Sequence, residues 1–313
     1  MKIVECRNLN KKLGNFQFQN VSFELEEGYI MGVIGVNGSG KSTLLKALMG
    51  SVSIPEQTEI WIDGYSLREN PKEAKQKLAF VLTDCPFAMG LTARENVQLF
   101  APLYDTWDET RFTHWMQRFR LDEKMKIGKL SKGQQMKFQL AFALSYDARI
   151  YFMDEPSANL DVEFREEFYQ IMREIVTDGD KSILYVTQLV EELDGLADYI
   201  LWMDKGKSLL CMDMETLQER FQIVTDSECG IEYLPKKLIV GRKFRESHNE
   251  ALIDTWRGKL LFPQTQRRAK MEEIMYYFME NPSSIQQFLL EQCENSRQQK
   301  GTDKSWIGGG IYV

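Results

Sequence analysis

The sequence predicts an α/β protein with a mainly parallel sheet, an inserted helical subdomain and a small C-terminal α+β domain. Short apolar runs of strand length alternate with helical patterns through most of the chain, which is typical of a parallel sheet covered by helices. A helical, aromatic-rich stretch interrupts this alternation midway, and the pattern changes again near residue 221. We therefore expect a first domain over residues 1–222, with a helical subdomain at about 84–146, and an accessory domain over 223–313.

The expected strands are short apolar runs bounded by turn residues. The run Tyr29–Ile34 is apolar throughout and has the length of a buried strand. Further strands are expected at Ile3–Leu9, Val21–Leu25, Ile60–Ile62, Leu78–Leu82, Ile150–Met153, Ser182–Val186 and Tyr199–Met203. Helical patterns cover Ser42–Met49, the stretch from Thr92 to Tyr146, Val162–Val176, a segment near Leu189–Leu196, and residues 269–293.

Composition narrows the classes of function. The chain is 43% hydrophobic and 27% charged, as in ordinary globular proteins, and its net charge of -7 gives no sign of a nucleic-acid-binding surface. Its 5 cysteines form no C-x-x-C pair, so we expect reduced thiols. No run approaches the roughly 20 apolar residues that span a bilayer, and the first residues lack the apolar core of a signal peptide. We expect a cytoplasmic protein that reaches a membrane only through a partner.

A glycine-rich segment follows the expected strand at Tyr29–Ile34. Its residues from Gly35 to Thr43 read GVNGSGKST, which matches the phosphate-loop pattern G-x-x-x-x-G-K-[ST] between a strand and a helix. Glycines let backbone N–H groups surround phosphates, while Lys41 adds a positive charge and Ser42 a magnesium ligand. An ordinary glycine turn before a helix is the alternative. The residues expected to bind nucleotide here are Asn37, Gly38, Ser39, Gly40, Lys41, Ser42 and Thr43.

Two adjacent carboxylates follow the expected strand Ile150–Met153. Ligands of α/β sheets bind at the carboxyl ends of the strands, so Asp154 and Glu155 are expected beside the phosphate loop. Asp154 suits the magnesium shell, directly or through water, and Glu155 suits a general base acting on water. Alone, an Asp-Glu pair at a strand end is usually only solvated; the phosphate loop makes the functional interpretation specific.

The motifs between and after these residues resemble those of the ABC ATPases. Residues 130–135, LSKGQQ, are similar to the signature motif of that family, with Lys132 where the usual pattern has glycine. Residues 157–161, SANLD, resemble its D-loop, which ends at Asp161. The purely structural interpretation of Ser131 and Gln134 is a helix capping box. A capping box and a signature motif are compatible at these residues. The signature residues are Ser131, Lys132, Gly133 and Gln134.

The resemblance, which covers roughly residues 1–220, implies a P-loop NTPase core that binds ATP and Mg²⁺. It implies that two such subunits pair head to tail, as a homodimer or heterodimer, with the signature of one closing over the nucleotide of the other. It also implies a separate membrane permease subunit and a peripheral location at the cytoplasmic face of the membrane. The sequence around Gly28–Gly32 and the Ser-Lys-Gly signature most resemble the corresponding motifs in ATPases of bacterial peptide, antibiotic and bacteriocin exporters.

Three positions depart from the family pattern. Thr83-Asp84 stands where the family usually has a glutamine, and Asp84 could coordinate magnesium through water. Gln188 stands in place of the switch histidine; its amide can donate to a γ-phosphate but carries no charge. The adenine-stacking aromatic corresponds to Leu13, with Phe16 and Phe18 nearby as substitutes.

These departures leave other functions open. One is a non-transport ABC ATPase, although the chain has a single cassette and no heptad run after the phosphate loop. Another is a nucleotide-gated clamp, or a degenerate partner in a heterodimer, that hydrolyses weakly. In the C-terminal domain, an apolar face at helical spacing must bury against its own domain or against a second subunit. Its residues are Met271, Ile274, Met275 and Phe278.

Overall fold

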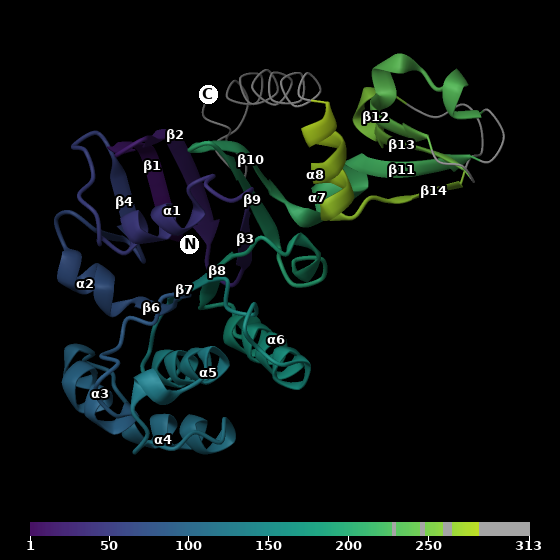
Figure 1. Ribbon diagram of the computed structural model, residues 1–313. Helices are drawn as coiled ribbons and strands as arrows, with labels where there is room; N and C mark the ends of the chain where they lie inside the picture. The colour runs from purple at the N-terminus through teal and green to yellow at the C-terminus, as the bar shows by residue number, and fades with distance from the viewer. Residues whose placement is uncertain (227–229, 245–247, 259–264, 282–313) are drawn as a thin grey trace. The chain divides into compact units, whose positions relative to one another are not determined.

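The computed structural model describes residues 1–226, 230–244, 248–258 and 265–281. Contacts divide the chain into two compact units (Figure 1). The first contains residues 1–188 and 201–208, and the second contains residues 189–200 and the described residues from 209 onward. Residues 282–293 of the expected last helix, Cys229 and Cys293 lie outside the described part.

The mainly parallel sheet has the strand order β10-β9-β3-β8-β7-β6. Its neighbours β3 and β8, β8 and β7, and β7 and β6 run parallel. Strands β3 and β8 are buried along their whole length, which explains why uniformly apolar runs encode them. The strands are β3 (Ile30–Ile34), β6 (Leu78–Val81), β7 (Ile150–Asp154), β8 (Ser182–Val186), β9 (Tyr199–Asp204) and β10 (Lys207–Asp213).

An antiparallel sheet with the order β2-β1-β4-β5 belongs to the first unit. Its strands β1 and β2 are longer than the apolar runs suggest, because their outer ends pair through polar and partly exposed residues. The strands are β1 (Lys2–Leu13), β2 (Phe16–Glu26), β4 (Glu59–Ile62) and β5 (Tyr65–Ser66), and two helices of the same region are α1 (Lys41–Leu48) and α2 (Pro71–Gln76).

A helical block follows β6, as expected. Figure 1 shows its helices, in blue and teal, lying together below the parallel sheet. Thr92 and Asp108 cap the first two helices, and α5 packs against both α4 and β6. Phe87, Phe138 and Phe142 meet in its aromatic core. The elements are α3 (Ala93–Phe100), η1 (Ala101–Leu103), α4 (Glu109–Arg118), η2 (Ile127–Lys129) and α5 (Lys132–Ala143); α6 (Val162–Thr177) follows β7.

The second unit holds an antiparallel sheet with the order β12-β13-β11-β14. One side of its core is formed by six buried apolar residues: Val224, Ile231, Leu234, Leu238, Ala251 and Ile253. Its elements are η3 (Val190–Glu192), α7 (Met214–Arg220), β11 (Phe221–Asp226), η4 (Gly230–Tyr233), η5 (Lys236–Leu238), β12 (Ile239–Phe244), β13 (Asn249–Asp254), η6 (Thr255–Arg257), β14 (Thr265–Arg268) and α8 (Met271–Glu280).

A buried ion pair joins α7 to the end of β13 in this unit. The Arg220 guanidinium donates to both carboxylate oxygens of Asp254, at 2.9 Å from Nε and 2.6 Å from the terminal nitrogen. Arg220 is 2% exposed and Asp254 is 0% exposed. Arg257 lies 3.2 Å from the same carboxylate. Bidentate geometry of this kind is what makes a fully buried pair tolerable.

One expectation for the second unit needs correction, and one of two open alternatives is supported. The segment near Leu189–Leu196 forms only the 3₁₀ turn η3, and Gly195 has a left-handed φ of +81°, which an α-helix cannot contain. The apolar face of α8 is buried, and α8 packs against β12, β13 and η3 of its own unit. The face therefore packs against its own domain, which is the first of the two alternatives that the sequence left open. Within the described residues, no helix combines the length and apolarity that a membrane crossing demands.

Candidate functional site

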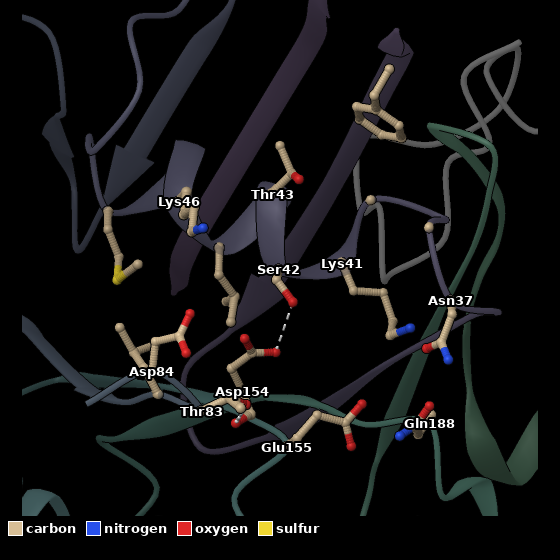
Figure 2. Close-up of a pocket in the computed structure, with 16 residues that line it drawn as sticks. Asn37, Lys41, Ser42, Thr43, Lys46, Thr83, Asp84, Asp154, Glu155 and Gln188 are labelled. Atoms are coloured by element: carbon tan, nitrogen blue, oxygen red, sulfur yellow. Dashed lines mark hydrogen bonds between the residues drawn. The ribbon is translucent and has the colours of Figure 1, made fainter. Parts of the chain in front are cut away.

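All the residues of the phosphate loop that were expected to bind nucleotide, except the buried Ser39, line one cavity of about 590 Å³ in the first unit (Figure 2). It lies where β3, β7 and β8 end at their carboxyl sides, the usual place for ligands of parallel sheets. Its lining residues are Phe16, Asn37, Gly38, Gly40, Lys41, Ser42, Thr43, Leu45, Lys46, Met49, Leu82, Thr83, Asp84, Asp154, Glu155 and Gln188.

The loop between β3 and α1 supplies the cavity's backbone wall. Gly40 is the N-cap residue of α1 and has a φ of +109°, a conformation that L side chains rarely adopt. A Cβ at this position would also collide with the ring of Phe16. Both constraints require glycine, and they allow the first N–H groups of α1 to face the cavity as an anion-binding terminus.

Lys41 is the buried cation of the cavity. Its Nζ donates to the Gly35 carbonyl at 2.7 Å and to the Val36 carbonyl at 3.4 Å. Burial lowers the pKa of Lys41, and the carboxylates of Glu155 and Asp154 oppose that shift. A phosphate placed beside this ammonium would favour its charged form, so anion binding and lysine protonation reinforce one another.

Asp154 and Ser42 form the oxygen cluster suited to magnesium. The Ser42 hydroxyl donates to Asp154 Oδ1 at 3.1 Å, and the Thr83 hydroxyl donates to the Asp154 carbonyl at 2.9 Å. Burial raises the pKa of Asp154, the hydrogen bond from Ser42 and the charge of Lys41 lower it, and Asp84 raises it further. Hydroxyl and carboxylate oxygens are the ligands that Mg²⁺ prefers.

These residues fit Mg²⁺ only as part of a larger shell. Across the described ranges, no three His, Cys, Asp or Glu side chains gather as a metal cluster. Magnesium usually keeps several waters and binds through one or two carboxylates together with substrate phosphates. Ser42 and Asp154 supply that limited protein share, and Asp84 lines the same cavity.

Glu155 adopts an unusual backbone conformation directly after β7. Its φ is +48°, in the left-handed region, and its N–H donates to the Val186 carbonyl at 2.9 Å. The Thr187 hydroxyl donates to its carboxylate at 3.4 Å, and the Gln188 backbone N–H also bonds to the Glu155 carboxylate. Burial is the largest influence and raises the pKa of Glu155. This arrangement aims a carboxylate of increased basicity at the cavity.

Gln188 lines the same cavity from the end of β8. Figure 2 shows its amide near the Glu155 carboxylate and across from Asn37. The Gln188 side chain is exposed, whereas the neighbouring Thr187 is buried. The position expected to replace a histidine therefore lines the same cavity as Lys41 and Glu155.

The signature residues and Asp161 do not line this cavity. Ser131 and Gln134 form the expected capping box of α5: Ser131 Oγ accepts from the Gln134 N–H at 3.2 Å, and Gln134 Oε1 accepts from the Ser131 N–H at 3.0 Å. A Cβ at Gly133 would come within 2.7 Å of the Asn159 carbonyl oxygen. The N-terminus of α5 thus lies directly against the 157–161 loop.

Asp161 has a local structural task in that loop. Its side chain accepts from the Phe164 N–H at 2.8 Å and caps α6, and it lies 3.7 Å from Lys137. The bond from Phe164 is the main reason that the pKa of Asp161 is lowered. The cap fixes the direction in which the loop enters α6.

Of the three residues considered for stacking on adenine, Phe16 lines the cavity, whereas Leu13 and Phe18 do not. Leu13 is partly buried at the end of β1, where it pairs with Phe16 across the hairpin. Phe16 contacts Phe18 edge to face, with ring centroids 4.9 Å apart. The aromatic surface next to the phosphate loop is therefore Phe16.

Four lining residues and one hydrogen-bonding residue escaped the sequence analysis. Lys46 follows Ser42 by one helical turn, so helical spacing from the phosphate loop could have identified it. Thr187 directly precedes Gln188, but a hydroxyl after a strand is too common to signal a role. The lining residues are Leu45, Lys46, Met49 and Leu82, and the bonding residue is Thr187.

A family model, curated relatives and solved structures all show similarity to ATP-binding proteins of transporters. The family model described as "ABC transporter" matches residues 18–158. ABC transporter ATP-binding protein YtrB of Bacillus subtilis (strain 168) is 30% identical over 235 residues, which cover 73% of this chain and 79% of YtrB. Ribose import ATP-binding protein RbsA of Bacillus cereus is 31% identical over 222 residues, covering 66% of this chain and 44% of RbsA. The solved dimer of MJ0796, a bacterial ABC transporter cassette, has a TM-score of 0.59 and 25% identity, covering 67% of this chain and 98% of MJ0796.

Proposed function

This chain belongs to the family of ABC transporter ATP-binding proteins, and from that premise we propose that it hydrolyses MgATP to drive a separate membrane subunit. The observation that carries the proposal is the meeting of Lys41, the Ser42–Asp154 pair and Glu155 in one cavity. Members of this family bind ATP and work together with membrane subunits.

Each side chain in the cavity has a role set by its chemistry. Lys41 and the N–H groups at the start of α1 bind the phosphates, and Phe16 offers a ring to the adenine. Ser42 and Asp154 hold Mg²⁺, which would neutralise charge on the phosphates when bound. Glu155 accepts a proton from the attacking water, and its raised pKa makes it a better base than a solvated glutamate.

The signature residues act across a dimer in this proposal. Ser131, Lys132, Gly133 and Gln134 lie outside the cavity of their own chain, as a role in trans requires. The capped N-terminus of α5 would present its N–H groups to the nucleotide of the second subunit. The solved MJ0796 cassette is a dimer, which supports this assembly.

We place the ATPase domain at residues 1–222 and an accessory domain at 223–313, at the cytoplasmic face of a membrane. Export is the direction proposed, because the Ser131-Lys132-Gly133 variant resembles the ATPases of peptide, antibiotic and bacteriocin exporters. Because the chain is also similar to a ribose import protein, the direction of transport needs a test of its own. Co-purification of the membrane subunit, followed by transport assays in vesicles of both orientations, is that test.

Two substitutions test the chemistry. Glu155→Gln should keep ATP binding but slow hydrolysis by about 10²–10⁴-fold, because a neutral amide cannot accept the proton. The substituted protein should accumulate as an ATP-bound dimer in size-exclusion chromatography. Lys41→Ala should weaken ATP binding strongly in calorimetric titration. Wild-type turnover in Glu155→Gln, or unchanged affinity in Lys41→Ala, would refute the assigned role.

A second candidate function is a nucleotide-gated clamp with little turnover. The neutral Gln188 and the carboxylate of Asp84 at the cavity favour it, since both weaken charge stabilisation of a phosphate. Steady-state ATPase activity of the purified dimer separates the two functions. A clamp would bind ATP and dimerise without measurable turnover.

A further inference from the structure

A buried glutamine connects the helix that carries the signature to the wall of the nucleotide cavity. Gln139 lies in α5 and is 2% exposed. Its Oε1 accepts from the Leu82 N–H at 2.9 Å, and its Nε2 donates to the Leu82 carbonyl at 3.0 Å. Both ends of one side-chain amide are therefore paired with a single backbone residue 57 positions away.

Leu82 occupies a critical place, because β6 ends just before it and the cavity begins there. Leu82, Thr83 and Asp84 all line the cavity. The Thr83 hydroxyl donates to the Asp154 carbonyl, next to the oxygen cluster suited to magnesium. Any shift of Leu82 would move these groups relative to Asp154.

The same helix holds the other end of this segment by aromatic packing. The Phe87 ring lies 4.8 Å from Phe138 and 5.0 Å from Phe142, centroid to centroid. Residues 82–87 thus form a strap, fixed to α5 by hydrogen bonds at Leu82 and by ring contacts at Phe87. The opposite end of α5 begins at the capped signature.

We infer that Gln139 is a positioning residue, which ties the placement of Thr83 and Asp84 at the cavity to the placement of the signature helix. This inference rests on the proposed ATP hydrolysis. A hydrophobic side chain at residue 139 would fill the space but remove the hydrogen-bond partner of the partly buried Leu82 N–H and carbonyl. The strap could then relax away from α5, and the cavity and the signature would move independently.

The test compares Gln139→Met with Tyr146→Phe. The Tyr146 hydroxyl donates to the Leu78 carbonyl at 2.9 Å, so this control removes a buried hydrogen bond from the same strand at its other end, away from the cavity. Gln139→Met should lower kcat roughly 10- to 100-fold with little change in KM, because misplacement of groups near the reacting atoms slows the chemical step. Tyr146→Phe should leave kcat close to wild type despite a similar loss of thermal stability.

Gln139→Glu provides a graded variant that should fold even if Gln139→Met does not. At this buried position the neutral carboxylic acid is favoured, and it can accept from the Leu82 N–H and donate to the Leu82 carbonyl as the amide does, although less firmly because any ionisation removes the donor. Its kcat should fall between those of wild type and Gln139→Met. Hydrogen exchange gives a readout independent of turnover: MgATP should slow exchange at the first turn of α5 in wild type, and this response should be lost in Gln139→Met while the phosphate loop remains protected.

The outcomes separate this inference from the proposed function. A wild-type protein that binds ATP without hydrolysing it would refute the proposed function, while the exchange response would still decide the role of Gln139. Equal losses of kcat in Gln139→Met and Tyr146→Phe would show a purely structural role. An exchange response retained in Gln139→Met would likewise overturn the inference.

Discussion

At the residue scale, both the backbone and the carboxylate of Glu155 are held in place by their surroundings. Its left-handed backbone turns the chain sharply at the end of β7, and its carboxylate is surrounded by Thr187, the Gln188 N–H and Lys41. A non-glycine residue in this conformation is uncommon and costs on the order of 1 kcal/mol or more. The surrounding bonds hold it there, and the result is a carboxylate whose direction is set before substrate arrives.

The raised pKa of Glu155 predicts a pH dependence. A general base works only when deprotonated, so kcat should fall as pH decreases through the pKa of Glu155. Because burial raises this pKa, the acidic limb should lie above the usual range for a glutamate. Measuring kcat at saturating MgATP from acidic to neutral pH checks this. An acidic limb at the pH of a solvated carboxylate would contradict it, and Glu155→Gln should show no such limb in its residual rate.

Gln188 offers a second prediction at the same scale. Its backbone N–H bonds to Glu155, so Gln188→Ala removes the side-chain amide without removing that bond. Loss of a donor aimed at developing charge should lower kcat by about one to two orders of magnitude. Gln188→His should raise turnover, because charge-assisted hydrogen bonds are stronger than neutral ones. Steady-state ATPase assays with the membrane partner present decide this, and unchanged turnover in Gln188→Ala would make the residue a spectator.

At the scale of elements, the contact between α5 and the 157–161 loop leaves no room for a side chain at Gly133. Gly133 lies in the first turn of α5, where alanine would normally improve a helix by about 1 kcal/mol. Here the Asn159 carbonyl occupies the space that a methyl group would need. The backbone of the signature helix at Gly133 therefore packs directly against the backbone of the loop that follows Glu155.

Gly133→Ala should therefore destabilise the protein instead of stabilising it. The added Cβ would lie 2.7 Å from the Asn159 oxygen, so α5 or the loop must shift, and both the melting temperature and ATPase activity should decrease. Gly90→Ala is the matched control, since a Cβ there meets nothing within 4 Å. Thermal unfolding of both variants checks this. A melting temperature for Gly133→Ala at or above wild type would contradict the expected clash.

Elements with strong local patterns could be predicted from the sequence, and long-range contacts could not. Strands β3, β7 and β8 consist mostly of apolar residues because both of their faces are buried, so they stand out from their surroundings. Strand β10 was missed because it is mostly half-exposed and mixed in composition. The phosphate loop and Asp154-Glu155 follow local rules, whereas the bonds from Gln139 to Leu82 depend on the packing of a helix on a strand 57 positions away.

At the scale of the whole molecule, the second unit has its own core rather than an extended hydrophobic surface. The apolar face of α8 is covered by the sheet that precedes it. The unit also contains exposed aromatic residues, but the apolar face of α8, for which a dimer contact was one of two alternatives, is buried. Under the proposed function, two ATPase subunits therefore pair through the nucleotide sites of the first unit.

This assignment predicts different outcomes for two positions on α8. Ile274 is 0% exposed and Met279 is 51% exposed. Ile274→Gln should lower the free energy of unfolding by about 2–5 kcal/mol, because it loses apolar burial and buries an amide. Met279→Gln should be nearly neutral. Denaturant unfolding and light scattering without nucleotide measure both effects. A stable Ile274→Gln protein that changes only its oligomeric state would instead support a dimer contact at α8.

The Arg220–Asp254 pair limits which substitutions evolution can accept at these two positions. Both partners are almost wholly hidden from solvent, so replacing Asp254 alone takes the carboxylate away from a buried guanidinium, at a cost of about 3–5 kcal/mol. Replacing Arg220 alone leaves Asp254 with only the Arg257 contact in place of a bidentate pair. Replacing both with apolar residues of similar volume can be nearly neutral. Natural variants should therefore keep both residues or exchange both together. Sequences with only one of the two residues should be rare. Arg220 and Asp254 should therefore change together in related proteins, whatever those proteins help to transport.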